Sequence, residues 1–388
     1  MQERQLETEL IHRGEGAAPQ ASPLTTPIYE TTTFLFESAA EVRQFAEGKS
    51  DKFLYSRYGN PTVAAVESKL AALERAEAAI VFSSGNAATA CTVMALAQAG
   101  DEVLCSAAVY GGTFHLLKDL LAQFGITIRF ITLEELNDAQ TSISDRTRAL
   151  WFETPTNPTL RCVDIRAVAA ACRARGIISV LDNTFASPIN QQPLTLGVDL
   201  VMHSATKYLN GHSDVTAGAV AGPREIVDKV NRVRRMLGPM LDPAAAYALG
   251  RGIKTLAVRV ERQNANALAL ARALEKDKRV QAVHYPGLES HPDHAVAKAQ
   301  MSGFGGMVCI DVGSLERAEQ CFDRLQVFQR AASLGGVESL CSLPVLTSHW
   351  GYTEEALARA GVTPGMMRFS VGLENVNDLI ADLQQALS

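Results

Sequence analysis

Short apolar runs rich in β-formers alternate with segments rich in Ala and Leu from about residue 60 to about residue 245, and this alternation restricts the fold most. The expected strands are Ala79–Ser83, Glu102–Ser106, Ile126–Ile131, Ala149–Glu153, Ile177–Leu181, Asp199–His203 and Gly218–Ala221. The expected helices between them are Thr62–Leu73, Ala87–Ala97, Thr113–Phe124 and Ile165–Ala174. Such alternation is typical of an α/β fold in which a mostly parallel sheet carries helices on both faces. We therefore predict a mostly parallel seven-stranded sheet.

The chain on either side of this region differs in composition and in the pattern of expected helices and strands. Residues 1 to about 55 are irregular and rich in Pro and Thr, so we expect them to pack on something else, such as a second subunit. A long helical stretch, Pro243–Lys276, leads into a tail with expected strands Met307–Asp311 and Arg368–Val371 and a helix from about Asn377. The predicted division is an N-terminal arm (1–57), a large domain (58–245) and a smaller C-terminal α+β domain (246–388).

The composition argues against several classes of protein. A net charge of -6 gives no reason to expect nucleic acid as a partner. The polar N-terminus lacks the apolar core of a secretory signal, and no apolar run is long enough to suggest a membrane partner. Seven scattered cysteines without a CxxC pair suit reduced thiols in the cytoplasm. The His291-x-x-His294 spacing contains a proline and has no evident third ligand, so no metal is expected.

Polar residues follow five of the expected strands at the point where each strand ends. They are Ser84-Gly85-Asn86, Tyr110, Asn157, Asp182, and Ser204-Ala205-Thr206-Lys207. Because ligands of open α/β sheets gather at the carboxyl ends of the strands, these residues predict a binding crevice there.

This set of side chains matches the chemistry of one kind of cofactor. A glycine at a helix start, together with the hydroxyls of Ser84, Ser204 and Thr206, can surround a phosphate. A partly desolvated lysine such as Lys207 can lose its proton and attack a carbonyl. Asp182 can keep a pyridine nitrogen protonated, and Tyr110 offers a ring for stacking and a phenol for proton transfer. Each residue alone is commonly a turn, a cap or a solvated side chain, so the prediction rests on their occurrence together.

At these residues the sequence resembles the Cys/Met metabolism (transsulfuration) family of fold-type I enzymes that use pyridoxal 5'-phosphate (PLP). The matching segments, in family order, are YSRYGNPT (55–62), SSGNAA (83–88), VYGGT (109–113), ETPTNP (153–158), LDNTF (181–185), HSATKYLNGHSDVTAG (203–218), RGIKTLAVR (251–259), SLGGVESL (333–340) and RFSVGLE (368–374). The resemblance therefore extends over nearly the whole chain.

The resemblance implies a role for each matching residue. Lys207 matches the lysine that holds PLP as a Schiff base, Asp182 the partner of the pyridine nitrogen, and Tyr110 the stacking tyrosine. The implied phosphate cup is Ser84, Gly85, Asn86, Ser204 and Thr206. Asn157, Ser333 and Arg368 match residues that hold the substrate carboxylate and orient the ring.

Two further matches imply an oligomer. Tyr55 and Arg57 correspond to a pair that reaches the phosphate of the neighbouring subunit. A homodimer is then the minimal active unit, and a homotetramer is the usual assembly of the family.

The implied reaction has Lys207 and Tyr110 as its catalytic residues. Lys207 removes the Cα proton and moves a Cβ proton, and the group at Cγ leaves with a proton from Tyr110. Elimination then yields an α-keto acid, ammonia and a thiol. Replacement instead adds a thiol.

The positions expected around the distal end of the substrate are mostly apolar. Enzymes that are specialised for cystathionine typically carry charged residues at the places that hold Leu54, His115 and Ala332 here, and Phe114 precedes His115. Burying a second charged group there would be costly, so an uncharged sulfur tail is favoured. Gly112 and Arg234-Arg235, however, depart from the Cys and the Lys-Asp pair that are typical of methionine γ-lyases.

We rank α,γ-elimination on methionine, homocysteine or cystathionine first. Replacement on O-acetyl- or O-succinyl-homoserine ranks second, and β-elimination from cystathionine or cysteine third. An aminotransferase of the same fold is disfavoured, because the quoted segments do not resemble that group. A binding module with a relic site is disfavoured because Lys207, Asp182 and Arg368 are all present.

Overall fold

The computed structural model describes residues 5–13 and 23–388 and confirms the predicted α/β fold. The strands of its larger sheet are β1 (Ala78–Phe82), β2 (Glu102–Ser106), β3 (Thr127–Ile131), β4 (Thr147–Glu153), β5 (Ile178–Asp182), β6 (Leu200–His203) and β7 (Gly218–Gly222). Their order is β1-β7-β6-β5-β4-β2-β3. Only β7 runs antiparallel to its neighbours β1 and β6 in this sheet of the described residues. The sheet is therefore mostly parallel and seven-stranded, as predicted.

Helices cover both faces of this sheet. They are α3 (Pro61–Glu74), α4 (Gly85–Leu96), α5 (Gly111–His115), α6 (Leu133–Asn137), α7 (Ala139–Ser142), α8 (Ile165–Ala174), α9 (Ser187–Asn190), α10 (Arg224–Leu237) and α11 (Pro243–Ile253), with a short 3-10 helix at Pro193–Leu196. Successive strand residues point to opposite faces. Val103 and Cys105 accordingly pack with residues of α4, whereas Leu104 packs with residues of α8.

The predicted helix Thr113–Phe124 is not a single α-helix. The chain forms α5 and then a π-helical turn at Leu116–Leu120 and a 3-10 turn at Leu121–Phe124. The predicted long helix Pro243–Lys276 is likewise divided at Lys254-Thr255, between α11 and α12 (Leu256–Leu274).

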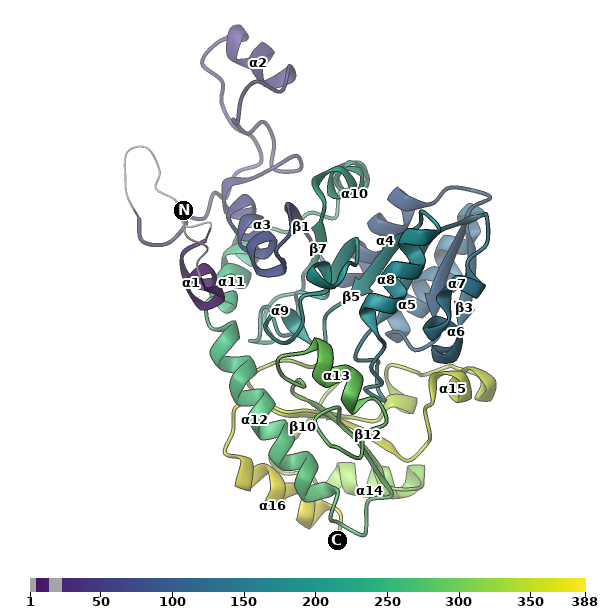
Figure 1. Cartoon of the computed structure of the whole chain (residues 1–388). Coiled ribbons are helices and arrows are strands. Elements are labelled where there is room, and N and C mark those ends of the chain that lie inside the picture. The colour runs from purple at the N-terminus through teal and green to yellow at the C-terminus, as the bar shows by residue number, and fades with distance from the viewer. Residues whose placement is uncertain (1–4, 14–22) are drawn as a thin grey trace.

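A second, five-stranded sheet forms from the C-terminal part of the chain. Its strands are β8 (Ala282–His284), β9 (Met307–Asp311), β10 (Gln329–Arg330), β11 (Leu340–Ser342) and β12 (Met366–Ser370), in the order β10-β11-β12-β9-β8. The helices of this part are α12, α13 (His294–Gln300), α14 (Leu315–Arg324), α15 (Glu354–Ala360) and α16 (Val376–Ala386), with a 3-10 turn at Pro344–Leu346. Figure 1 shows α12, α14 and α16 around this sheet. The division at residue 245 remains a prediction, and that residue lies inside α11, which packs on α3.

The N-terminal region is extended. Helix α1 (Leu6–His12) packs on α3 through the buried Leu10. Helix α2 (Ala39–Ala46) has no buried residue, and its segment projects away from the two sheets in Figure 1. The predicted arm 1–57 lies partly outside the described residues, because 1–4 and 14–22 are not among them. In the part that is described, no helix is both long enough and apolar enough to cross a membrane.

Candidate active site

A cavity of about 590 Å³ lies at the carboxyl ends of the parallel strands. Residues of the second sheet and its loops close the cavity from the other side. Its wall includes most of the predicted site residues, namely Ser84, Gly85, Asn86, Tyr110, Asn157, Asp182, Ser204, Thr206, Lys207, Ala332, Ser333 and Arg368. The predicted crevice therefore exists, and it has the volume of a small-molecule site.

Lys207 lies in this cavity, in the turn that follows β6. Its Nζ donates a hydrogen bond to Ser333 Oγ at 2.9 Å. Burial, assisted by the positive charge of Arg368, lowers the pKa of the Lys207 ammonium to about 8. The fraction of neutral, nucleophilic amine near neutral pH is therefore much larger than for an exposed lysine.

Asp182 is the last residue of β5 and is almost fully buried. Its Oδ1 accepts hydrogen bonds from Thr184 N at 3.0 Å and from Thr184 Oγ1 at 2.5 Å. Burial raises the pKa of Asp182, while these two hydrogen bonds and the field of His203 act in the opposite direction. A buried carboxylate with these supports suits a cationic pyridine nitrogen.

The start of α4 lies at the cavity wall, with the Ser84 and Ser204 hydroxyls beside the helix N-terminus. Ser84 caps the helix, its Oγ accepting from Ala87 N at 3.1 Å. A Cβ added at Gly85 would lie 3.2 Å from both Cβ and Oγ of Ser204, so a side chain there would fill the space beside the helix terminus. Backbone N–H groups and the helix dipole favour an anion at such a position. These residues, with Lys207 and Asp182, fit PLP.

Tyr110 precedes α5 at the open side of the cavity, where it is 48% exposed. Its backbone N donates to Glu153 Oε1 at 2.7 Å. The ring passes over Gly112, because a Cβ at Gly112 would lie 2.3 Å from Tyr110 Cε1. The ring is therefore free to serve as a stacking surface.

Arg368, on β12, is buried at the far wall of the cavity. Its Nη1 donates to Asn157 Oδ1 at 3.0 Å, and its Nη2 contacts Ser333 O at 3.3 Å. Its Nε is buried and has no partner within the described structure. A guanidinium that is held at the cavity wall by two neutral acceptors, with no carboxylate partner among the described residues, is well suited to a substrate carboxylate.

The structure does not bring every predicted site residue into the cavity. Leu54 and Tyr55 lie on the projecting arm and are partly exposed, and Arg57 Nη1 donates to Arg235 O at 3.1 Å. Phe114 does not line the cavity, because its ring packs on Phe130 and Tyr352 with centroid distances of 4.5 and 4.6 Å. The predicted apolar contact of Phe114 with the substrate is therefore not built within this chain.

Other cavity residues were not singled out from the sequence. Glu153, Thr184 and Ser348 all line the cavity. Glu153 ends a strand next to β5, so the strand-end criterion that selected Asp182 could have found it. Ser348 lies on an irregular loop, for which no comparable signal exists.

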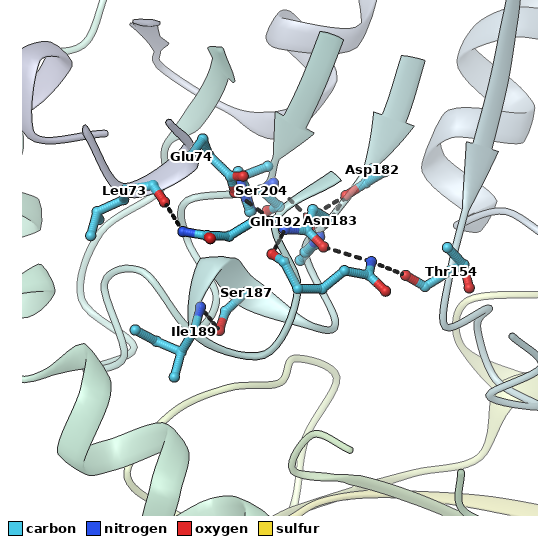
Figure 2. Close-up of polar contacts among 12 residues, drawn as sticks. Leu73, Glu74, Thr154, Asp182, Asn183, Ser187, Ile189, Gln192 and Ser204 are labelled. Carbon is cyan, nitrogen blue, oxygen red and sulfur yellow. Dashed lines mark hydrogen bonds and ion pairs between the residues drawn. The ribbon is translucent and has the colours of Figure 1, made fainter. Parts of the chain in front are cut away.

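A buried polar network holds the strand ends in place behind the cavity (Figure 2). Glu74 Oε1 contacts His203 Nε2 at 2.5 Å and accepts from Asn183 Nδ2 at 3.2 Å. Gln191 Nε2 donates to Thr154 O at 2.9 Å and to Asn183 Oδ1 at 2.9 Å. The ends of β4, β5 and β6, which carry the site residues, are thereby joined to α3.

The two histidines of the His291-x-x-His294 segment lie apart from this site. His291 Nδ1 accepts from Asp293 N, and His294 Nδ1 contacts Pro286 O. Among residues 5–13 and 23–388, no group of three or more His, Cys, Asp or Glu side chains could hold a metal ion.

Comparisons with known proteins place this chain in a family. The family described as "Cys/Met metabolism PLP-dependent enzyme" matches residues 7–388. The chain is 41% identical to an L-methionine gamma-lyase of Fusobacterium nucleatum subsp. nucleatum, covering 100% of this chain and 99% of the relative. It is 40% identical to the chloroplastic cystathionine gamma-synthase 1 of Nicotiana tabacum, covering 97% of this chain and 71% of the relative.

A solved structure agrees with these relatives. The structure titled as cystathionine gamma-lyase from Lactobacillus plantarum complexed with L-serine superposes with a TM-score of 0.92 at 37% identity, covering 99% of this chain and 98% of the other. With the cavity residues described above, these similarities show that the chain belongs to the Cys/Met metabolism family of PLP-dependent enzymes.

Proposed function

We propose that this enzyme is a carbon–sulfur lyase that performs α,γ-elimination on a sulfur amino acid, with methionine and homocysteine ahead of cystathionine. Methionine and water give α-ketobutyrate, ammonia and methanethiol. The observation that carries this choice is the distribution of charge in the cavity. Among the described residues that line it, Arg368 is the only arginine and Lys207 the only lysine, and the acids Asp182 and Glu153 end adjacent strands. One guanidinium serves one substrate carboxylate, and a second amino-carboxylate group would be buried without a partner.

The residues of the cavity divide the chemical work. Arg368, held by Asn157, binds and orients the substrate carboxylate. Lys207, once its amine is neutral, accepts the Cα proton and transfers a proton at Cβ. The Tyr110 phenol supplies a proton to the departing sulfur. When bound, PLP supplies the electron sink for the negative charge that develops at Cα. Ser84, Gly85, Asn86, Ser204 and Thr206 would hold its phosphate.

A substrate panel tests this proposal. The purified enzyme is incubated separately with methionine, homocysteine, cystathionine, and O-acetylhomoserine plus sulfide. We expect α-ketobutyrate from methionine in excess of that from cystathionine. Homocysteine formation from O-acetylhomoserine plus sulfide, without α-keto acid from the three thioether or thiol substrates, would establish replacement instead. Pyruvate from cystathionine would establish β-elimination.

We further propose that the active unit is a homodimer and that two dimers form a tetramer. The exposed apolar side chains of the arm support this proposal, since Leu24 and Leu35 are each 91% exposed in the single chain. Tyr55 and Arg57 stay outside their own cavity, as expected if they complete the site of a partner.

A complementation experiment tests the shared site. Lys207→Ala and Arg57→Ala subunits, each with low activity alone, are mixed under conditions that exchange subunits. In such a mixture one site receives both an intact Lys207 and an intact Arg57, so activity should recover. No recovery in mixed oligomers verified by mass spectrometry would refute the proposal.

We also propose a cytoplasmic location. All seven cysteines are unpaired and buried, as suits a reducing compartment. Fractionation of the producing cells, followed by immunodetection of the protein, tests this assignment. Recovery outside the cytoplasm would contradict it.

A further inference from the structure

Glu153 is a buried acid that the mechanism above does not use. It is the last residue of β4, and its register partner on the parallel strand β5 is Asp182. Both carboxyls line the cofactor cavity, and both residues are buried, with 4% and 8% of their surface exposed. Adjacent strands lie about 4.8 Å apart, so the two carboxyls are close together in a buried region of low dielectric. Ionisation of one carboxyl therefore disfavours ionisation of the other.

The hydrogen bonds around this pair are unequal. Asp182 Oδ1 receives two donors from Thr184, and the field of His203 also favours the anion. Glu153 receives one donor, Tyr110 N. No Lys, Arg or His side chain forms an ion pair with either acid in the described part of the chain. When two such carboxyls receive unequal stabilisation of the anionic form, the carboxyl with more hydrogen-bond donors ionises and the other keeps its proton.

The other titratable groups near Glu153 do not supply a counter-charge. The titratable groups that interact electrostatically with Glu153 are the Cys105 thiol on β2 and the Tyr352 phenol before α15. Burial raises the pKa of both, so both are neutral in the physiological range. Burial and the charge of Asp182 also raise the pKa of Glu153 well above that of an ordinary glutamic acid. The two cations of the same cavity bond elsewhere, Lys207 to Ser333 Oγ and Arg368 to Asn157 Oδ1 and Ser333 O.

We propose that Glu153 is a positioning residue that stays neutral and proton-bearing at neutral pH, holding the Tyr110 backbone through one oxygen and leaving Asp182 as the single anion facing the pyridine end of PLP. The proposal rests on the cofactor and not on the proposed substrate. A second anion beside Asp182 would compete for the same pyridine proton. Glutamine, which is neutral and isosteric, should therefore substitute for Glu153, whereas alanine should not.

Infrared spectroscopy of the holoenzyme tests the protonation state directly. The wild-type minus Glu153→Gln difference spectrum at neutral pH should contain the carbonyl band of a protonated carboxylic acid, shifted on exchange into D₂O. The matched control is Glu102→Gln. Glu102 is also a buried strand residue. Burial acts to raise the pKa of its carboxyl, but hydrogen bonds from Arg129, Thr147 and Ser144 outweigh burial and lower that pKa. Its difference spectrum should show carboxylate bands only. Absence of the protonated band at Glu153 would overturn the proposal.

Cofactor affinity tests the positioning role. Glu153→Gln should bind PLP within about threefold of the wild type, and the pH midpoint of the absorption of the lysine-bound cofactor should not move. Glu153→Ala leaves Tyr110 N without its acceptor and should weaken PLP binding by roughly tenfold or more. Equal loss in the two variants, or no loss in Glu153→Ala, would refute the role. Thermal unfolding of each variant separates these outcomes from misfolding, and the infrared result does not depend on which substrate is turned over.

Discussion

Replacing Arg368 with leucine should raise the pKa of Lys207 and slow the attachment of PLP. The pKa of Lys207 falls from 10.5 to about 8, with burial the larger cause and Arg368 the second. This shift corresponds to about 3 kcal/mol in favour of the neutral amine. Leucine removes the positive charge while the burial remains, so the pKa should return only part of the way toward 10.5. A rise of about one unit would lower the neutral fraction at neutral pH about tenfold.

The assay is rapid mixing of apoenzyme with PLP, followed by absorbance over a series of pH values. The midpoint of the rate profile reports the pKa of Lys207. Ser333→Ala serves as a control of opposite sign, because it removes the acceptor at 2.9 Å that favours the ammonium form, and its midpoint should fall below that of the wild type. An unchanged or lowered midpoint in Arg368→Leu would refute this account of Lys207.

Three further changes have expected outcomes that a denaturation experiment can check. Glu74→Ala removes the acceptor of the buried His203, so the free energy of unfolding in urea should fall by about 3 kcal/mol. A smaller loss than that of a variant at an exposed glutamate would contradict the stabilising role of this contact. Gly111→Ala should lower the melting temperature markedly, because the added Cβ would lie 1.8 Å from the backbone oxygen of Ser348, and an unchanged melting temperature would show that this loop yields easily. Burial disfavours the Asp382 anion, but three backbone N–H donors outweigh burial and lower the pKa of its carboxyl in the folded state. The Asp382 anion therefore stabilises the fold at pH values above the unfolded-state pKa, and this contribution is lost as the pH falls through the folded-state pKa. Asp382→Asn should therefore be less stable than the wild type at neutral pH and should flatten the acid limb of the stability profile; a parallel profile would count against this assignment.

The strand-end pattern predicted the part of the site that comes from one sheet. Asp182 ends β5 and Lys207 follows β6 in the larger sheet, so the known convergence of strand ends brings them together. Ser333 and Arg368 belong to the second sheet and its loops, and nothing in local periodicity says that Arg368 on β12 contacts Asn157 in the loop after β4. Those two residues could be predicted only from the family resemblance.

Other differences arise from tertiary packing. The apolar spacing at Leu116, Leu117, Leu120 and Leu121 reads as a regular helix, yet the chain widens to a π turn and then tightens to a 3-10 turn there. Hydrophobic spacing does not distinguish these neighbouring helical forms over so few residues. Phe114 was predicted at the substrate, but the aromatic partners Phe130 and Tyr352 come from distant segments that the sequence does not reveal as neighbours.

The contact of Arg368 with Asn157 and that of Lys207 with Ser333 join the two sheets inside the cavity. The affinity for substrate and the docking of the C-terminal part of the chain are therefore coupled equilibria. A carboxylate that binds Arg368 should stabilise that docked arrangement by mass action, in proportion to its occupancy. The residues that we propose to hold the phosphate and the pyridine nitrogen within one chain, such as Ser204 and Asp182, lie at the strand ends of the larger sheet. An enzyme in which only the C-terminal part has unfolded should therefore keep its cofactor and lose affinity for substrate. The rate at which a protease cleaves the C-terminal part should therefore fall when a substrate analogue binds, and the size of this decrease reports the binding free energy.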